Sequence, residues 1–372
     1  TQDSLWYWAS AGKTLTAFLI GKAQEEKLLS ISEASSKYLG LGWTNAPKEK
    51  EDKITIRHQL TMTSGLDDGV PDNHCTAKSC LIYLADAGTR WAYHNAPYNL
   101  LEQVIEKASG QSINTYTALK LKSTIGLTGA WSTVDYDNVF FSKPRSMARY
   151  GLLALNNFVW DSQPVLNDKQ YIHDMINSSQ QLNMSYGYLW WLNGKTGYML
   201  PTLQTVFSGS YAPQAPADMF AGLGKNGQIL SVSPSKGIVI VRMGNQPNSP
   251  ASDVSTLFCN QIWTALNAAI DDATGVGKTN TAPENFSLAQ NYPNPFNPVT
   301  IINYQISGYS HVSLKVFDVL GREVATLVDE YKQPGLYSSQ FSIVNYELPS
   351  GVYFYQLKTG NFVETKKMMV VK

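Results

Sequence analysis

The segment Trp8–Gly21 reads WASAGKTLTAFLIG, and its first residues are compatible with two different chemistries. It contains Gly-Lys-Thr, which ends a phosphate-binding loop, and it places Ser10 and Lys13 three residues apart before an apolar run. The phosphate loop also needs a glycine five positions before the second glycine, where this chain has Tyr7. A second Gly-Lys-Thr, within Gly275–Thr279, lacks that glycine as well. We therefore reject a nucleotide site and pursue the serine.

Ser10 and Lys13 are spaced to lie on one face of a helix, one turn apart. A serine hydroxyl is a weak nucleophile until a neighbouring base takes its proton, and a lysine can do this where its surroundings favour the neutral amine. The N-terminus of a helix adds backbone N–H groups that favour developing negative charge. Because Ser-x-x-Lys is common by chance, this pair needs partners elsewhere in the chain.

The stretch Trp91–Ser112, WAYHNAPYNLLEQVIEKASGQS, supplies those partners. Tyr93 and Asn95 stand two apart, just before a helical pattern that is expected to end at Gly110, a fitting C-cap position. Tyr93 is a candidate general base that would share a proton with Lys13, and Asn95 is placed to orient that lysine and a substrate carbonyl. His94, between them, is predicted to point away from both and to pack locally.

With these motifs the chain resembles the serine β-lactamase and penicillin-binding-protein superfamily. It is most similar to the branch with a Tyr-x-Asn second motif: class C β-lactamases, D-alanyl-D-alanine peptidases, family VIII carboxylesterases and 6-aminohexanoate-dimer hydrolases. Lys53–Asp68, KITIRHQLTMTSGLDD, resembles the segment between the first two motifs of that branch. The resemblance implies an α+β fold, with a helical subdomain beside an antiparallel sheet, and a reaction through an acyl-enzyme. The residues predicted to carry it are Ser10, Lys13, Tyr93 and Asn95.

The third motif of this superfamily, usually Lys-Thr-Gly on a strand that lines the site, is harder to place. The tripeptide occurs at Lys195–Gly197 and Lys358–Gly360, and we interpret both as chance matches. The glycine-rich turn and strands that normally follow the motif place it instead at Met219–Gly222, with a changed sequence. We expect a backbone N–H near Gly222 to complete an oxyanion site with that of the nucleophile. Lys225 is a candidate for binding a substrate carboxylate, and a solvated turn lysine is the alternative.

Loss of the Lys-Thr-Gly lysine bears on the substrate. That lysine usually helps to hold the carboxylate of a β-lactam or of a peptide C-terminus, so its absence favours a hydrolase of other small esters or amides. A β-lactamase or a D-alanyl-D-alanine peptidase is the alternative.

Only nine residues precede Ser10, where the superfamily has a helix and two sheet strands. Those N-terminal strands are therefore expected to be missing, which would leave an unpaired sheet edge. A truncated, non-catalytic surface protein is the alternative of a different class.

Composition excludes some classes of partner, and the cysteines indicate the redox compartment. The net charge is zero and only 16% of residues are charged, which argues against nucleic acid as a partner. No apolar run is long enough to predict a transmembrane segment. No metal-ligand cluster or cofactor motif is visible, so the predicted reaction needs no cofactor and no metal. Cys75 and Cys80, in CTAKSC, are candidates for a local disulfide typical of an oxidising compartment, or for two unpaired loop thiols.

The last part of the chain has a different character. We predict a hydrolase domain at 1–270, a turn-rich linker at 271–283, and an all-β, immunoglobulin-like sandwich at 284–372 built from short alternating strands. Its motifs NPFNP, LGREV and SGVYFY together resemble the type IX secretion sorting domain. The resemblance implies the type IX secretion machinery as a partner and a location outside the bacterial cell or on its surface. A carbohydrate-binding or adhesive sandwich is the alternative. The first residues carry no signal peptide and no starting Met, so we interpret the sequence as a mature form or a fragment.

Overall fold

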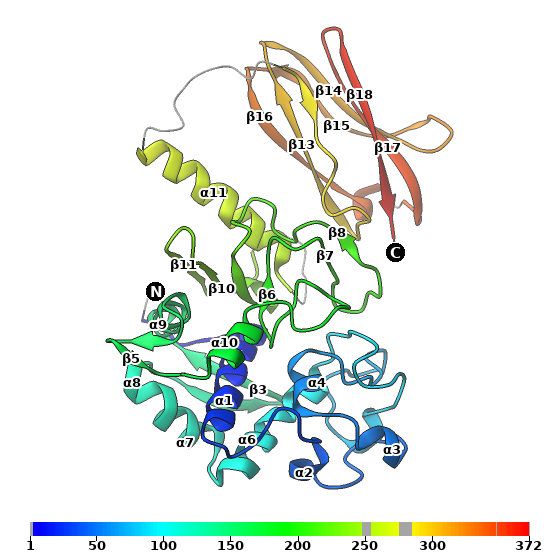
Figure 1. Cartoon of the computed structure of the whole chain (residues 1–372). Coiled ribbons are helices and arrows are strands. Elements are labelled where there is room, and N and C mark those ends of the chain that lie inside the picture. The colour runs from blue at the N-terminus through cyan, green and yellow to red at the C-terminus, as the bar shows by residue number, and fades with distance from the viewer. Residues whose placement is uncertain (1–2, 248–253, 275–284, 347, 372) are drawn as a thin grey trace. The chain divides into compact units, whose positions relative to one another are not determined.

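A computed structural model of the chain describes residues 3–247, 254–274, 285–346 and 348–371. The chain divides into two compact units, Thr1–Leu266 and Asn267–Lys372 (Figure 1). The predicted linker at 271–283 lies outside the described residues from 275 onward, and its first four residues continue a helix.

Helices make up much of the first unit. They are η1 (Ala9–Gly12), α1 (Lys13–Glu25), α2 (Ser36–Leu39), α3 (Lys48–Glu51), α4 (Ile56–Leu60), η2 (Lys78–Cys80), α5 (Asn95–Asn99), α6 (Leu101–Ser109), α7 (Ile113–Thr117), η3 (Ala118–Lys122), α8 (Ser123–Ile125), α9 (Pro144–Leu155), α10 (Lys169–Met175), η4 (Lys225–Gly227) and α11 (Thr256–Thr274). Helix α1 is buried on nearly every side, as expected of an apolar helix in a core. Helix α6 ends where predicted, at Gly110, whose φ of 69° is the left-handed cap that glycine favours.

Two antiparallel sheets flank these helices. The smaller has the order β1-β3-β2, with β1 (Trp6–Tyr7), β3 (Asp137–Ser142) and β2 (Ala130–Val134). The larger has the order β11-β10-β9-β6, with β11 (Ile238–Arg242), β10 (Gln228–Ser233), β9 (Phe220–Gly224) and β6 (Trp191–Leu192). The two-stranded pairs are β4 (Val159–Trp160) with β5 (Gln163–Pro164), and β7 (Gly197–Tyr198) with β8 (Phe207–Ser208). Strand β11 is an edge strand, and its side chains are partly buried.

The sequence YGYLWWLNG, Tyr186–Gly194, has the aromatic, glycine-bounded pattern that predicts a strand, but little of it forms one. The aromatic run Tyr186–Gly194 forms a strand only at Trp191–Leu192. The backbone N–H of Gly187 donates to the carbonyl of Trp190 at 2.9 Å, and Leu189 has a φ of 61°, so the chain turns sharply there. The aromatic side chains are buried because the turn itself lies in the core, and not because they follow a strand.

Strand β9 brings the large sheet close to the start of α1. A side-chain carbon at Gly222 would lie 3.0 Å from the carbonyl oxygen of Ala11, and one at Gly224 would lie 2.7 Å from that of Trp8. Glycine at both positions therefore permits the close approach of η1 to the sheet. This packing places the nucleophile region directly on β9.

The second unit contains two antiparallel sheets, as the sequence predicted. One has the order β12-β13-β16 and the other β15-β14-β17-β18. The strands are β12 (Ser287–Leu288), β13 (Val299–Ile306), β14 (Ser310–Phe317), β15 (Glu323–Lys332), β16 (Gly335–Ser342), β17 (Gly351–Thr359) and β18 (Phe362–Val370), with a short helix η5 (Ile343–Tyr346). Alternate residues of β13, β14 and β17 are buried in a common core. Lys358 and Thr359 end β17, and Gly360 begins the turn after it, as expected of a strand end.

Candidate active site

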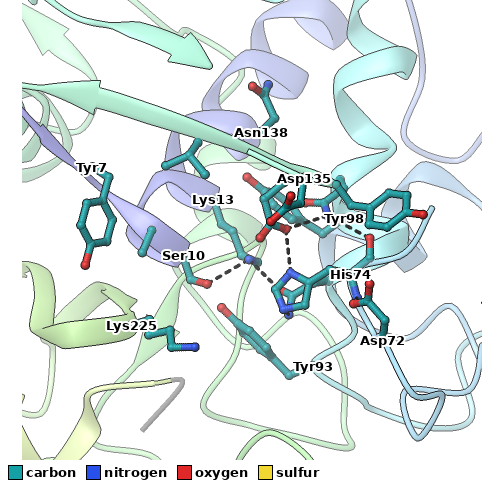
Figure 2. Close-up of a pocket in the computed structure, with 16 residues that line it drawn as sticks. Tyr7, Ser10, Lys13, Asp72, His74, Tyr93, Tyr98, Asp135, Asn138 and Lys225 are labelled. Carbon is teal, nitrogen blue, oxygen red and sulfur yellow. Dashed lines mark hydrogen bonds and ion pairs between the residues drawn. The ribbon is translucent and has the colours of Figure 1, made fainter. Parts of the chain in front are cut away.

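Ser10 lies on η1, one turn before Lys13 at the start of α1 (Figure 2). The Oγ atom of Ser10 is 3.1 Å from the Nζ atom of Lys13, and only 4% of the lysine is exposed. The preceding residue, Ala9, has a φ of 48°, which is uncommon for a residue with a side chain. Backbone strain of this kind persists where the surrounding structure holds a residue in a required direction. The two residues selected by their spacing are therefore in direct contact.

The ammonium group of Lys13 is held from the side of α5. The Oδ1 atom of Asn95 accepts a hydrogen bond from Lys13 Nζ at 2.9 Å. The nitrogen also lies 4.1 Å from the ring centre of Tyr98 and 5.2 Å from that of Tyr93, within the range of cation–π attraction. Burial raises the pKa of Tyr98 far above its usual range, so its phenol stays neutral. Tyr98 therefore stabilises Lys13 through its ring and is unsuited to act as a base.

Tyr93 faces the same space as Ser10 and Lys13. Figure 2 shows its hydroxyl turned toward these two residues. Its ring stacks on Trp191, with ring centres 5.8 Å apart and an interplanar angle of 28°, and it makes an edge contact with Tyr186. The buried aromatic turn described above thus fixes the direction of the Tyr93 hydroxyl. The structure brings together all four residues predicted to be catalytic.

These residues line a cavity of about 620 Å³. The lining also includes residues outside the two motifs. Tyr7 of β1 and Lys225 of η4 lie on one side, and the side chain of Lys225 extends toward the space between Ser10 and Tyr93 (Figure 2). The cavity is large enough for a small molecule and is lined by groups of both charges.

Several cavity residues escaped the sequence analysis. They are Asp72 and His74, from the loop before the cysteine pair, and residues 135–139, from the turn between β2 and β3 and the start of β3. None stands in a motif with the catalytic residues. The adjacent pair His74–Cys75 is the only local signal that could have drawn attention to the loop.

The structure separates the candidates for the third motif. Strand β9, which follows Met219, packs on the nucleophile region, whereas Lys195–Gly197 runs from the connection after β6 into the first residue of β7 and does not line the cavity. Gly222 lies on β9 but does not line the cavity either. The N–H of Asn193 donates to the carbonyl of Met219 at 2.8 Å. Because strand residues two apart share an edge, positions 221, 223 and 225 follow Met219, and Gly222 faces β10.

His94 and the cysteines are placed as structural residues. His94 is 2% exposed and does not line the cavity, and burial lowers the pKa of its imidazole to about 4. Cys75 and Cys80 form a disulfide with a Cα–Cα distance of 5.9 Å. This bridge closes the loop directly after His74. Cys259 of α11 is a buried thiol.

The fold and site together define a serine hydrolase of the β-lactamase type. The family model described as Beta-lactamase matches residues 1–257, and the chain belongs to this family. A second model, described as the Secretion system C-terminal sorting domain, matches residues 290–372. This type IX sorting domain implies a secreted or cell-surface protein. Along the described residues, no helix has both the length and the apolar character needed to cross a membrane.

Individual relatives are distant. A protein of Alkalihalophilus pseudofirmus named only as uncharacterized is 25% identical over 280 residues, which cover 67% of this chain and 76% of that protein. A Bacillus anthracis structure assigned as a 6-aminohexanoate-dimer hydrolase has a TM-score of 0.53 and 18% identity, covering 75% of this chain and 74% of its own. A Bacteroides dorei structure assigned as a β-lactamase has a TM-score of 0.52 and 16% identity, covering 72% and 86%. These structures show a shared fold.

Proposed function

We propose that this protein is an exported serine hydrolase that cleaves a small ester or amide through an acyl-enzyme on Ser10. One observation carries the proposal. Lys13 Nζ lies 3.1 Å from Ser10 Oγ and 2.9 Å from Asn95 Oδ1, in a cavity toward which the Tyr93 hydroxyl is also turned (Figure 2). A nucleophile, a base and a residue that orients the base are thus within reach of one another.

The reaction has two halves. In the first, Ser10 Oγ attacks the substrate carbonyl carbon while its proton passes to the Lys13–Tyr93 pair, which in its reactive form is an ammonium beside a phenolate, and the same proton then leaves with the departing alcohol or amine. In the second, water gives a proton to that pair and attacks the acyl group, and the proton returns to Ser10 as the acid is released. Asn95 keeps Lys13 in place through both halves. Apart from the attacking water, no group outside the chain is needed to balance either half.

Negative charge on the carbonyl oxygen needs two donors. The N–H of Ser10 is one, at the start of the helical segment. For the second we propose the N–H of Lys225 in place of Gly222. Lys225 lines the cavity and shares the strand edge of Met219, whereas Gly222 faces β10. This assignment keeps the donor on the segment that packs against η1.

The charge of Lys225 bears on the substrate class. Its side chain extends into the cavity, where it would attract a substrate carboxylate (Figure 2). This observation keeps a β-lactamase or D-alanyl-D-alanine peptidase as a second candidate function beside the esterase or amidase. The 6-aminohexanoate-dimer hydrolase assignment of one structural relative is a further reason to include linear amides in a substrate screen.

Hydrolysis and covalent labelling test the proposal together. We expect the chain to hydrolyse p-nitrophenyl butyrate and to gain one fluorophosphonate adduct, located on Ser10 by peptide mass spectrometry. Ser10→Ala should abolish both. A folded chain that hydrolyses no member of an ester, amide and β-lactam panel and takes no label would instead identify a non-catalytic surface protein.

The sorting domain supplies the proposed route of export. Its two packed antiparallel sheets are compatible with an immunoglobulin-like sandwich, and we propose that the type IX secretion machinery recognises it. Fusing residues 275–372 to a periplasmic reporter in a host with this machinery should carry the reporter to the medium or the cell surface. Retention of the reporter in the periplasm would contradict the proposed partner.

A further inference from the structure

Three segments meet beside Asn95. His74 comes from the segment directly before the disulfide, Asp137 begins β3, and Asn99 lies one turn after Asn95 on α5. The Nδ1 atom of His74 is 2.7 Å from Asp137 Oδ1, and Asn99 Nδ2 donates to the same oxygen at 2.9 Å. The Nε2 atom of His74 is 3.2 Å from Asn95 Nδ2. A continuous chain of polar contacts therefore runs from Asp137 to Lys13.

The charge of Asp137 determines where His74 carries its proton. Burial alone would raise the pKa of Asp137, but hydrogen bonds from His74 and Asn99 lower it overall below its usual range. Asp137 is therefore a carboxylate near neutral pH and can only accept. His74 must then donate from Nδ1, and in the neutral ring Nε2 is left as an acceptor.

That acceptor fixes the orientation of the Asn95 amide. The Nδ2 atom of Asn95 faces two acceptors, His74 Nε2 at 3.2 Å and Asn73 Oδ1 at 3.3 Å. Its two hydrogens are thereby directed away from Lys13, and Oδ1 is directed toward it. The reversed amide would point hydrogens at an ammonium group and oxygen at two acceptors, which is unfavourable on both sides.

We infer that His74 and Asp137 are positioning residues, which hold the Asn95 amide in the orientation that presents its oxygen to Lys13. The inference rests on the proposed function, since it assigns this pair a role in the same reaction. Protonation of His74 turns Nε2 into a donor and removes the acceptor that Asn95 requires. Catalysis therefore requires His74 to be neutral.

Other charges surround His74 and must be considered in any pH study. Asp72 caps the backbone N–H of His74 at 3.0 Å, Asp135 lies in the turn between β2 and β3 at the cavity, and Lys13 lies beyond Asn95. A merely structural role for the pair, tying the loop to β3, would show no dependence of catalysis on the ring nitrogen.

Two substitutions at His74 separate these roles. His74→Gln retains an acceptor near the position of Nε2 but cannot titrate, whereas His74→Phe retains a ring without an acceptor. We expect His74→Phe to lower kcat about tenfold or more, with KM changed less than about threefold, because misdirecting Asn95 weakens positioning in the transition state. His74→Gln should keep kcat within about threefold and should flatten the acid limb of the kcat/KM profile. Equal activities and an unchanged acid limb in both folded variants would overturn the inference.

Asp137→Asn gives a second, directional test. An amide can donate as well as accept, so it no longer holds the His74 proton on Nδ1, and kcat should fall with KM changed less than about threefold. An unchanged kcat in a folded variant would overturn the inference.

A spectroscopic measurement does not depend on activity. The chain has five histidines, so nitrogen-15 labelling of histidine gives a simple spectrum in which His74→Gln assigns one ring. We expect His74 to show the Nδ1–H form at neutral pH, and the Nε2–H form or a charged ring would overturn the inference. If the chain hydrolyses nothing yet shows the Nδ1–H form, the proposed function fails while the amide orientation stands. If the chain is active and His74→Phe matches the wild type, only this inference fails.

Discussion

The residues that line the cavity fall into two groups, which are brought together in different ways. One group comes from two short motifs, Ser10–Lys13 and Tyr93–Asn95, in which the reacting groups lie within three residues of each other. The rest of the lining comes from the segment directly before the disulfide, from the β2–β3 turn, and from Lys225 after β9. Catalytic residues can be recognised in a sequence where the chemistry requires them to be only a few residues apart. Cavity residues that tertiary packing brings together from distant segments show no such spacing.

The largest effect on activity should follow from a substitution in the Ser10–Lys13 motif. Lys13→Met keeps the length of the side chain but removes the amine that contacts Ser10. We expect kcat/KM to fall about a thousandfold, within the range for loss of a general base. Lys22→Met on the same helix is the control, because Lys22 pairs with Glu25 and lies outside the cavity lining. A Lys13→Met variant within tenfold of the wild type would remove Lys13 from the reaction.

Low pH should lower the stability of the fold through His94, the residue between Tyr93 and Asn95. His94 lies between Tyr93 and Asn95 but is buried, and burial lowers its pKa from 6.5 to about 4. Between these values the unfolded chain binds a proton that the folded chain does not, so the free energy of unfolding falls as pH falls. The loss should reach about 3 kcal/mol.

Urea unfolding at pH 7 and at pH 4.5 measures this loss. His94→Phe should reduce the difference between the two pH values, and the remainder includes His58, whose pKa burial also lowers. An unchanged difference in His94→Phe would show that other groups govern the acid sensitivity of the fold.

The next prediction tests Lys225, outside the two motifs, as the second donor to the oxyanion. Lys225 is the first residue of η4, a position that accepts proline, and Gly224 before it is extended, with φ of −122° and ψ of 158°. Lys225→Pro therefore removes the proposed N–H donor with little disturbance of the backbone. We expect kcat to fall on the order of a hundredfold, the usual effect of losing one such donor.

Lys225→Ala is the matched control, since it retains the N–H and loses only the ammonium group. It should keep kcat within about threefold for a neutral ester and raise KM only for substrates that carry a carboxylate. Equal losses in the two variants would assign the effect to the side chain and leave the second donor to another residue.

Removing the disulfide tests how far the positions of Asp72 and His74 depend on this covalent bridge. Cys75 and Cys80 close a six-residue loop, for which the loop-entropy model gives about 2 kcal/mol of stability. Replacing both by serine should lower the free energy of unfolding by up to this amount. Activity should fall further than in a surface control such as Ser32→Ala, because the bridge directly follows Asp72 and His74, which line the cavity. Unchanged stability and activity would show that packing alone holds the loop.

The same contrast explains what could be predicted from the sequence. The apolar pattern of α1, the cap at Gly110 and the alternation in β13, β14 and β17 are local, and each formed where expected. The direction of the N–H at Gly222 depends on the register of β9 between β10 and β6, which no local pattern records. The contact between His74 and Asp137 joins residues 63 positions apart and was equally hidden.

The smallest effect should come from removing the sorting domain. All residues that line the cavity lie between Tyr7 and Lys225, and the sorting domain has a core of its own. A chain ending at residue 274 should therefore keep kcat/KM within about twofold. This end point retains α11, whose Trp263 is fully buried and donates to Ser231 of β10 at 3.0 Å. A chain ending at residue 255 loses that anchor and should unfold at a lower urea concentration. A folded chain ending at 274 that loses more than tenfold in kcat/KM would show that the sorting domain shapes the catalytic site, and the cavity could then no longer be attributed to the first unit alone.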